Sequence, residues 1–445
     1  MSCTKLKETL TNSIYKICSD IDSYVCNPGK DYSRVRKLPA ENVISYLISQ
    51  GGSSTKCEFL DFYMLSQETP TVSALNQRRS QLKPDAFKAV FHEFTNSYME
   101  SETVQYDSNY QYIATDGSTI SFSSLPRFAS DEYYISEGHS ASGFYSMHIN
   151  ALYDLNQHIY TDALIQPAHQ KDEFAAFCSL VDRHLLVPDT KSIFIGDRGY
   201  CSYNNMAHVI EKGQYFLFRT KDIYSKGLIG NFDFPDTDEF DIIVHVTLTR
   251  SHRKTIQVPE GYYRRYVDHA ASFDYIKYGS EDTYNLKFRI VRFSISEDSY
   301  ECIVTNLPEE SFPPEKIKEV YNLRWGIETS FRKLKYTIGL SFYHSYKPDF
   351  IKQEIWAKLI AYNATEFMIN TTICSQGNCK YTYAINFSVA AHICRIYLRL
   401  LTEVESIDVM ALLKKELIPV RPGRQFPRLK TAHFRKPKYL IYRAA

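Results

Sequence analysis

The stretch Tyr110-Gln-Tyr-Ile-Ala-Thr-Asp-Gly-Ser118 decides how the middle of the chain is interpreted. Residues 110–115 are rich in the aromatic and β-branched side chains that favour strands. The predicted strand runs directly into Asp116, so we expect an acidic side chain at its end. Asp-Gly-Ser is also a common turn sequence, and this motif alone does not identify a site.

The segments that follow complete an α/β pattern. Residues 144–152 and 158–165 predict a β-hairpin, and residues 170–186 predict an amphipathic helix. Residues 192–195 then predict a short buried strand that ends at Asp197. The order strand, hairpin, helix, strand, with an acid at the end of the first and last strands, resembles the beginning of an RNase H-like fold.

A long helix is predicted over residues 314–336, with its start marked by Pro313-Pro314-Glu315. Four polar residues share a stripe about 60° wide on this helix, at about 100° per residue: Tyr321, Arg324, Glu328 and Lys335. The apolar residues form a separate stripe: Val320, Leu323, Ile327 and Leu334. We therefore expect one buried face and another that presents an acid beside two cations and a phenol.

This polar stripe has a chemical interpretation. A glutamate carboxylate suits Mg²⁺, and neighbouring Arg and Lys side chains suit a phosphate. With Asp116 and Asp197, Glu328 would make three carboxylates, enough to hold two Mg²⁺ ions about 3.5–4 Å apart. The alternative is a solvated helix face in which Arg324 and Glu328 form an ordinary i, i+4 pair.

In combination, these motifs resemble the DDE transposases of bacterial insertion sequences, in the branch with the signature Tyr-x2-Arg-x3-Glu-x6-Lys. That signature is complete from Tyr321 to Lys335. Asp116-Gly-Ser, Asp197-Arg-Gly-Tyr200 and the segment from Ala74 to Phe87 also match, so the likeness spans residues 70–345.

The resemblance implies roles for the matching residues. Three carboxylates would bind two Mg²⁺ ions, for which Mn²⁺ can substitute: Asp116, Asp197 and Glu328. Three further side chains would hold phosphates of the transposon end: Tyr321, Arg324 and Lys335. Some relatives stack a flipped base on a Trp in a strand-rich insertion, but both Trp residues of this chain, Trp325 and Trp356, lie elsewhere. The base-flipping residue therefore stays unassigned.

The implied activity is cut-and-paste transposition, with strand cleavage, strand transfer and, as in some relatives, a hairpin intermediate. The implied partners are the terminal inverted repeats, target DNA and a second copy of the chain, which would form a homodimer on DNA. Alternatives are an RNase H-like nuclease without strand transfer, a decayed copy that only binds DNA, and a structural DNA-binding protein whose acids are turns and caps.

The expected domain organisation follows from the same pattern. A helical DNA-binding domain would span residues 1–105, and an RNase H-like core would combine residues 106–219 and 307–372. A β-rich insertion would span residues 220–306. A C-terminal helical region with a basic tail would span residues 373–445.

The charge distribution points to DNA more than the total charge does. The net charge is only +1, but eight Lys or Arg residues and no acid lie between Arg421 and Arg443. Aromatic residues lie between these cations, as expected for a segment that neutralises phosphates. A solvated tail is the alternative.

The cysteines suggest a reducing compartment. None of the 10 Cys residues forms a CxxC pair. Cys374, Cys379, His392 and Cys394 could be zinc ligands, although the last two lie two apart on a predicted helix and point to different faces. With no signal peptide and no long apolar run, we expect a cytoplasmic protein without a membrane partner, associated with the nucleoid when bound to DNA.

Overall fold

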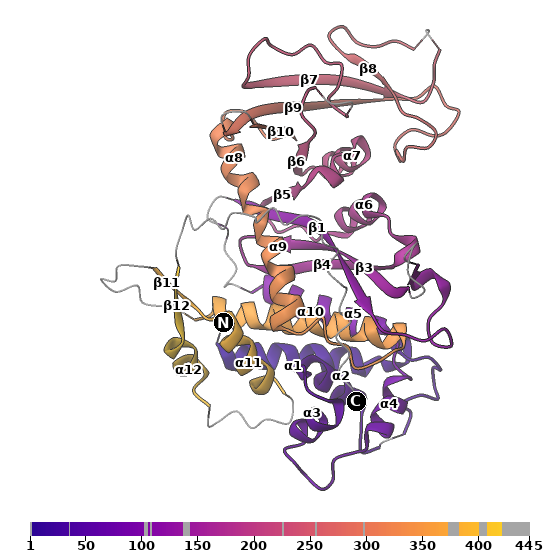
Figure 1. The fold of residues 1–445 in the computed structure, drawn as a ribbon, viewed down its shortest axis with the longest axis vertical. Helices are drawn as coiled ribbons and strands as arrows, with labels where there is room; N and C mark the ends of the chain where they lie inside the picture. Colours follow the sequence, from indigo (N-terminus) through magenta and orange to yellow (C-terminus); the bar gives the residue numbers. More distant parts are fainter. Residues whose placement is uncertain are drawn as a thin grey trace.

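The computed structural model describes residues 2–34, 36–101, 106, 109–136, 143–224, 227–253, 256–296, 299–372, 382–399 and 407–420. A long mixed β-sheet runs through the molecule, and a layer of helices lies across its lower end in Figure 1. The basic tail from Arg421 to Arg443 lies outside the described residues, as do Cys374 and Cys379. What the sequence predicts for these positions stays a prediction.

The N-terminal part of the chain forms helices. They are α1 (Cys3–Ser19), the 3-10 helix η1 (Ile21–Tyr24), α2 (Ala40–Ser49), α3 (Thr55–Phe62), α4 (Val72–Arg79) and α5 (Pro84–Met99). Ser2, Ser54 and Thr71 cap α1, α3 and α4, because each side chain accepts a hydrogen bond from a backbone N–H of the first turn. Proline occupies the first position of α5, where its missing N–H costs nothing.

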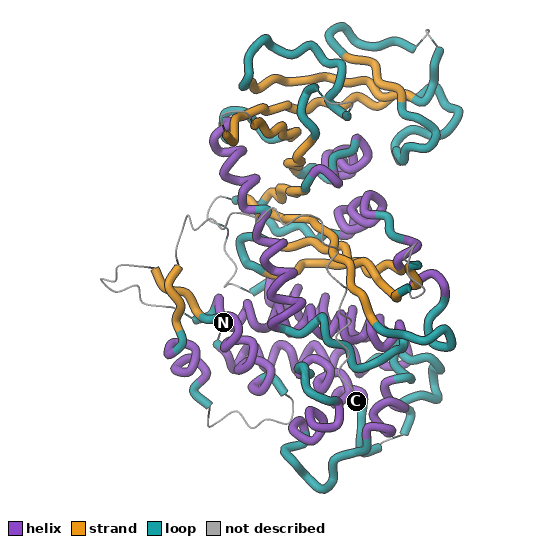
Figure 2. The backbone as a smooth tube through the Cα atoms, in the orientation of Figure 1, coloured by secondary structure: helices purple, strands orange, loops and turns teal. Residues whose placement is uncertain are grey.

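Ten strands form one sheet, which Figure 2 shows in orange. They are β1 (Tyr110–Phe122), β2 (Tyr134–Ile135), β3 (Phe144–Asp154), β4 (Ile159–Pro167), β5 (Lys191–Gly196), β6 (Tyr215–Thr220), β7 (Phe240–Thr249), β8 (Tyr263–Tyr266), β9 (Thr283–Ser296) and β10 (Ser299–Thr305). The order is β2-β3-β1-β5-β6-β10-β9-β7-β8, and β4 also pairs with β3. Strands β1, β5 and β6 are parallel, whereas β3 is antiparallel to β1 and β10 is antiparallel to β6.

The prediction that the first strand ends at Asp116 is wrong. Strand β1 continues to Phe122, because its second half pairs with β3 as far as Phe122 opposite Tyr145. Its parallel pairing with β5 ends earlier, at Ala114 opposite Ile195. Asp116 therefore lies inside a strand, at the point where β1 loses one of its two neighbours.

Both faces of the sheet are covered. Phe194 of β5 packs in one cluster with α6 (Glu173–Arg183) and α7 (Tyr203–Glu211), whereas its neighbours Ile193 and Ile195 pack in the other. Alternate residues of a strand point to opposite faces, so one short apolar strand serves both cores. The 3-10 helices η2 (Asp131–Tyr133), η3 (Ala168–Gln170) and η4 (Arg198–Tyr200) lie in the connections between these elements.

The predicted helix over residues 314–336 is broken into three. It consists of α8 (Pro314–Leu323), α9 (Trp325–Arg332) and the short π-helix η5 (Lys333–Thr337). The break falls at Arg324, and α9 packs against β1. Gly326 leaves room for a side chain that follows β3, since a Cβ at this position would lie 2.6 Å from Leu155 Cδ2.

Helix α10 (Pro348–Asn370) is buried along most of its length and packs against α5, α2 and α11 (Phe387–Tyr397). A buried ion pair, Arg79 to Glu354 at 2.8 Å, ties it to α4. The remaining elements are α12 (Val409–Lys415) and a two-stranded sheet of β11 (Thr382–Ile385) and β12 (Leu417–Val420). No helix in the described ranges is long and apolar enough to cross a membrane.

Candidate active site

Two of the predicted acids are brought together by the register of the sheet. Ala114 of β1 lies opposite Ile195 of β5 in parallel pairing, and Asp116 and Asp197 each follow two residues later. Asp116 Oδ1 accepts a hydrogen bond from the N–H of Gly117 at 2.8 Å. Asp197 caps η4, where its Oδ1 accepts from the N–H of Gly199 at 2.7 Å.

The third acid, Glu328, is supplied by α9. Its Oε1 lies 2.8 Å from Arg324 Nη2, and this ion pair holds the carboxylate in place beside the sheet. Helix α9 is fixed against the sheet by a hydrogen bond between the hydroxyls of Ser330 and Tyr160, which are 2.8 Å apart. We call Asp116, Asp197 and Glu328 the acidic triad.

The three carboxylates share one electrostatic environment. The pKa of Asp116 is raised to about 6, first by burial and then by the negative charges of Asp197 and Glu328. The N–H of Gly117 and the guanidinium of Arg324 oppose this rise. A buried carboxylate with like-charged neighbours is stabilised by a bound cation, and three oxygen ligands suit a hard divalent ion such as Mg²⁺.

The two cations of the predicted polar stripe also face this region. Lys335 Nζ donates a hydrogen bond to the backbone oxygen of Thr119 at 3.2 Å, and the charge of Asp116 acts on it. Burial lowers the pKa of Lys335 below its usual value, and the negative charge of Asp116 offsets part of this shift. Arg324 pairs with Glu328 through Nη2, but its Nε has no hydrogen-bond partner among the described residues. A phosphate oxygen would be a suitable partner for that N–H.

Tyr321 differs from the expectation of an open face. It is buried, as is Arg324, although the helical wheel separates both from the apolar stripe. Its hydroxyl also lacks a hydrogen-bond partner in the described part of the chain. The helix face that carries the four signature residues therefore packs against the sheet. Tyr321 and Arg324 are buried, whereas Glu328 and Lys335 are half-buried.

The pairing of His148 with Glu173, next to the triad, was not predicted from the sequence. His148 of β3 is buried, and its Nε2 lies 3.0 Å from Glu173 Oε1 at the start of α6. The pKa of Glu173 is lowered to about 2, chiefly by this contact with His148 and also by Lys171. A Cβ on Gly117 would lie 2.3 Å from His148 Nε2, so only glycine fits between Asp116 and this pair. The sequence offered one signal for this pair: Glu173 directly follows Asp172, the residue that caps α6.

The carboxylate oxygens of the triad are not drawn into a compact cluster. Among the described residues, the one group of three side chains with ligand atoms all within 4.8 Å of one another is Cys178, His208 and Asp274. The triad is therefore an open arrangement, in which an ion and a phosphate would complete the contacts.

Comparisons with known proteins identify the family of the chain. The family described as the transposase DDE domain matches residues 107–364, which is more than half of the chain. The transposase for insertion sequence element IS421 of Escherichia coli is 33% identical over 76 residues, covering 17% of this chain and 20% of that protein. Transposase InsG for element IS4 of E. coli K12 is 28% identical over 131 residues, covering 26% and 28%.

The aligned stretches therefore span less than a third of these curated relatives. Among solved structures, a cryo-EM structure of the piggyBac transposase synaptic complex with hairpin DNA is similar, with a TM-score of 0.46 and 9% identity over 95% of this chain and 86% of that one. The family match is the decisive finding, because the matched range 107–364 includes every predicted site residue, from Asp116 to Lys335. The chain belongs to the family of transposases with a DDE domain.

Proposed function

We propose that this chain is the transposase of an insertion sequence, which binds the terminal inverted repeats of its element and cuts and rejoins DNA strands at their ends. One observation carries the proposal: the β1–β5 register sets Asp116 beside Asp197, and Glu328 reaches the same place from α9. Three carboxylates from three separate elements are seldom brought near enough to repel one another for stability alone, since this repulsion costs free energy.

The residues present fit divalent metal ions. The triad offers only carboxylate oxygens. The pKa of Asp116 is raised first by burial and then by the negative charges of Asp197 and Glu328, and a bound cation would offset both effects. When bound there, two Mg²⁺ ions would activate the attacking oxygen and stabilise the leaving oxygen of the phosphodiester. Mn²⁺ would substitute, because it also prefers oxygen ligands.

The protein itself would position the DNA strand. Arg324 would keep Glu328 oriented through Nη2 and offer its unpaired Nε to a phosphate. Lys335 would hold a second phosphate as a point charge, and Tyr321 would offer its unpaired hydroxyl as a neutral donor. Tyr321 acts here as a phosphate contact and not as a nucleophile.

We infer an RNase H-like core from the strand order. Strands β4-β3-β1-β5-β6 form a mixed sheet in which β1, β5 and β6 are parallel and β3 is antiparallel. The core would combine residues 106–219 and 307–372, interrupted by the β-rich segment 220–306. Residues 1–105 would bind DNA, and residues 373–445 would form the C-terminal region.

The chain would act as a homodimer, since two transposon ends must be held together before they are joined to target DNA. A hairpin at the cut end is the proposed intermediate, because a freed 3′-OH can attack the opposite strand. The protein would work in the cytoplasm, on the nucleoid.

The decisive experiment is cleavage of a labelled duplex that carries the element's own terminal repeat, with Mg²⁺. The variant is Asp197→Asn, and the control is Asp189→Asn, an exposed residue at the opposite end of β5. Cleavage and strand transfer by wild type and control, but not by Asp197→Asn, would support the proposal. Cleavage without strand transfer would indicate a nuclease, and repeat binding without cleavage would indicate a copy that only binds DNA.

A further inference from the structure

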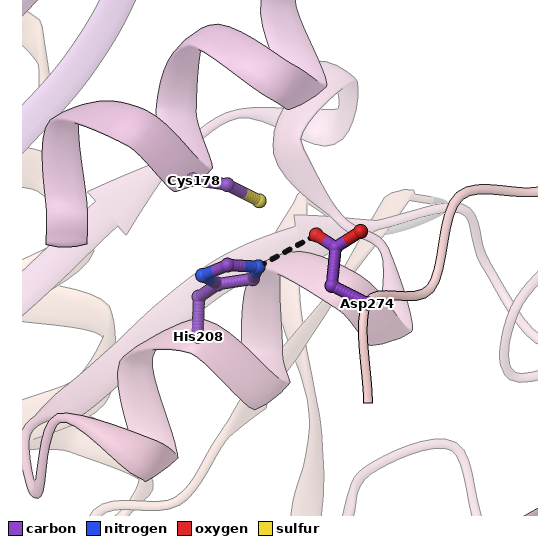
Figure 3. A group of neighbouring side chains, drawn as sticks. All are labelled: Cys178, His208 and Asp274. Atoms are coloured by element: carbon purple, nitrogen blue, oxygen red, sulfur yellow. Dashed lines mark hydrogen bonds and ion pairs between the residues drawn. The ribbon is translucent and has the colours of Figure 1, made fainter. Parts of the chain in front are cut away.

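A second group of ligand-forming side chains lies outside the acidic triad. Cys178 of α6, His208 of α7 and Asp274 of the β8–β9 connection offer one ligand atom each, all within 4.8 Å of one another. Figure 3 shows the three side chains converging from these elements. We call them the cysteine–histidine cluster.

The imidazole of His208 lies between two carboxylates. Its Nδ1 is 2.8 Å from Asp182 Oδ1, and its Nε2 is 2.8 Å from Asp274 Oδ2. A neutral imidazole carries a single N–H, so it can donate to only one of them. When Nδ1–H donates to Asp182, the lone pair of Nε2 points toward a carboxylate oxygen, which is a repulsive contact unless a cation lies near.

This arrangement matches the surroundings of metal-bound histidine. Such a histidine commonly donates its second N–H to a carboxylate, which fixes the tautomer and the ring orientation. Asp182 is placed to do this for His208. The carboxylate of Asp274 is itself oriented, because Asn204 Nδ2 donates to its Oδ2 at 2.9 Å and Asn204 Oδ1 accepts from its backbone N–H at 2.9 Å.

The donor set indicates which class of ion would bind. One sulfur, one nitrogen and one oxygen ligand suit Zn²⁺ and its neighbours better than Mg²⁺ or Ca²⁺. Cys178 and His208 are buried, whereas the Asp274 side chain is 60% exposed. The site is therefore open on one side, where an ion can enter and water can occupy a fourth position.

The geometry points to a binding site for a divalent ion of the zinc class at Cys178, His208 and Asp274, which fastens the β8–β9 connection to α6 and α7. On binding, the Cys178 thiol releases its proton to solvent, and the charges of the thiolate and the carboxylate balance the ion. The site is independent of the acidic triad, which contains no sulfur ligand.

The test uses Co²⁺ as a coloured substitute for zinc in the full-length chain, purified with a chelator and a reductant. We expect one ion per chain with a thiolate-to-cobalt charge-transfer band in the near ultraviolet, which Zn²⁺ displaces. Cys178→Ser should lose this band. Asp182→Asn should weaken binding about 10–100-fold, as expected for removal of the partner that orients a histidine ligand.

The matched control is Cys302→Ser. Cys302 is also buried beside a carboxylate, with its Sγ 3.2 Å from Asp222 Oδ1, and this variant should keep the band. A second readout is the melting temperature, which Zn²⁺ should raise more in wild type than in Cys178→Ser. If Cys178→Ser does not fold, His208→Gln and Asp274→Asn replace it.

Absence of the band in wild type, or its persistence in Cys178→Ser, would overturn the inference. A protonated His208 that simply bridges the two carboxylates would give no band, and Zn²⁺ would change the melting temperatures of wild type and Cys178→Ser equally.

Discussion

The acidic triad and the cysteine–histidine cluster differ in how their ligand atoms are arranged before an ion binds. In the cluster the ligand atoms already lie within 4.8 Å of one another, and neighbouring amides and a carboxylate orient them. In the triad, Arg324 holds Glu328 at 2.8 Å, and burial and repulsion raise the pKa of Asp116 to about 6. A site whose ligand atoms already lie together needs only its ion, whereas a site whose carboxylates are spread apart and repel one another needs both ions and substrate. The comparison suggests a structural role for the first and a reaction at the second.

Glu328→Gln tests whether the reaction takes place at the triad, and we expect it to have the largest effect on cleavage. The amide oxygen can still accept from Arg324, but a charge of the triad is lost, so we expect cleavage to fall about 1,000-fold or more. Binding of the transposon end should change by only a few-fold. Glu319→Gln on α8, an exposed acid paired with Lys316 at 3.2 Å, is the control and should remain active. Loss of binding as large as the loss of cleavage would contradict the proposed role of Glu328.

Gly117→Ala would disturb the triad by placing a methyl group against His148 and Glu173. The new methyl group would lie 2.3 Å from His148 Nε2 and 2.9 Å from Glu173 Oε1, so the strand or the histidine must move. We expect cleavage to fall about 100-fold and stability to fall by about 1–3 kcal/mol, as for an overpacked core. Chemical denaturation and the cleavage assay measure the two effects. In a His148→Ala background the closest clash is absent, so Gly117→Ala should cost less stability there than in wild type; an equal loss in both backgrounds would count against this explanation.

Acid should weaken metal binding at the triad. The pKa of Asp116 is raised to about 6, chiefly by burial, so below that pH a metal ion must displace a proton. The affinity for Mn²⁺ should therefore fall about tenfold per unit as the pH drops below 6 and level off above it. Calorimetric titration between pH 5 and pH 8 measures this. A constant affinity over that range would contradict the prediction that Asp116 binds the ion with a raised pKa.

Lys335→Ala should have the smallest effect. Loss of one phosphate contact should weaken binding of the transposon end several-fold and reduce the slope of log K against log salt by about 0.9. Lys316→Ala, on the exposed side of α8, is the matched control. If the salt dependence of the Lys335 variant equals that of wild type, Lys335 does not contact a phosphate.

Much of the fold follows from local patterns, and the exceptions depend on distant contacts. The β3–β4 hairpin and helix α6 lie close to their predicted ranges, because alternation and helical spacing are local signals. The extension of β1 beyond Asp116 depends on pairing with β3, which a turn-like Asp-Gly-Ser sequence conceals. Local sequence patterns also give no sign that β10 pairs with β6, the contact that joins the β-rich segment to the rest of the sheet.

The site was predictable to the extent that strand order and helical spacing determine it. Acids after the predicted first and fourth strands were expected to meet, and the β1–β5 register places Asp116 and Asp197 together. Burial of Tyr321 was not predicted, because the helix breaks at Arg324 and a continuous helical wheel no longer applies. Cys178 and Asp274 lie too far apart in the sequence for any spacing motif to link them.

The pairing of β6 with β10 has a consequence for protein engineering. Thr220 of β6 lies directly opposite Cys302 of β10, so the chain leaves the core and returns to it at neighbouring positions of one antiparallel ladder. Such neighbours are joined in ordinary hairpins by loops of about two to five residues. The segment between Thr220 and Cys302 could therefore be replaced by a short hairpin loop, or by a foreign domain whose two ends lie close together. Neither replacement would change the order of the strands that carry the triad.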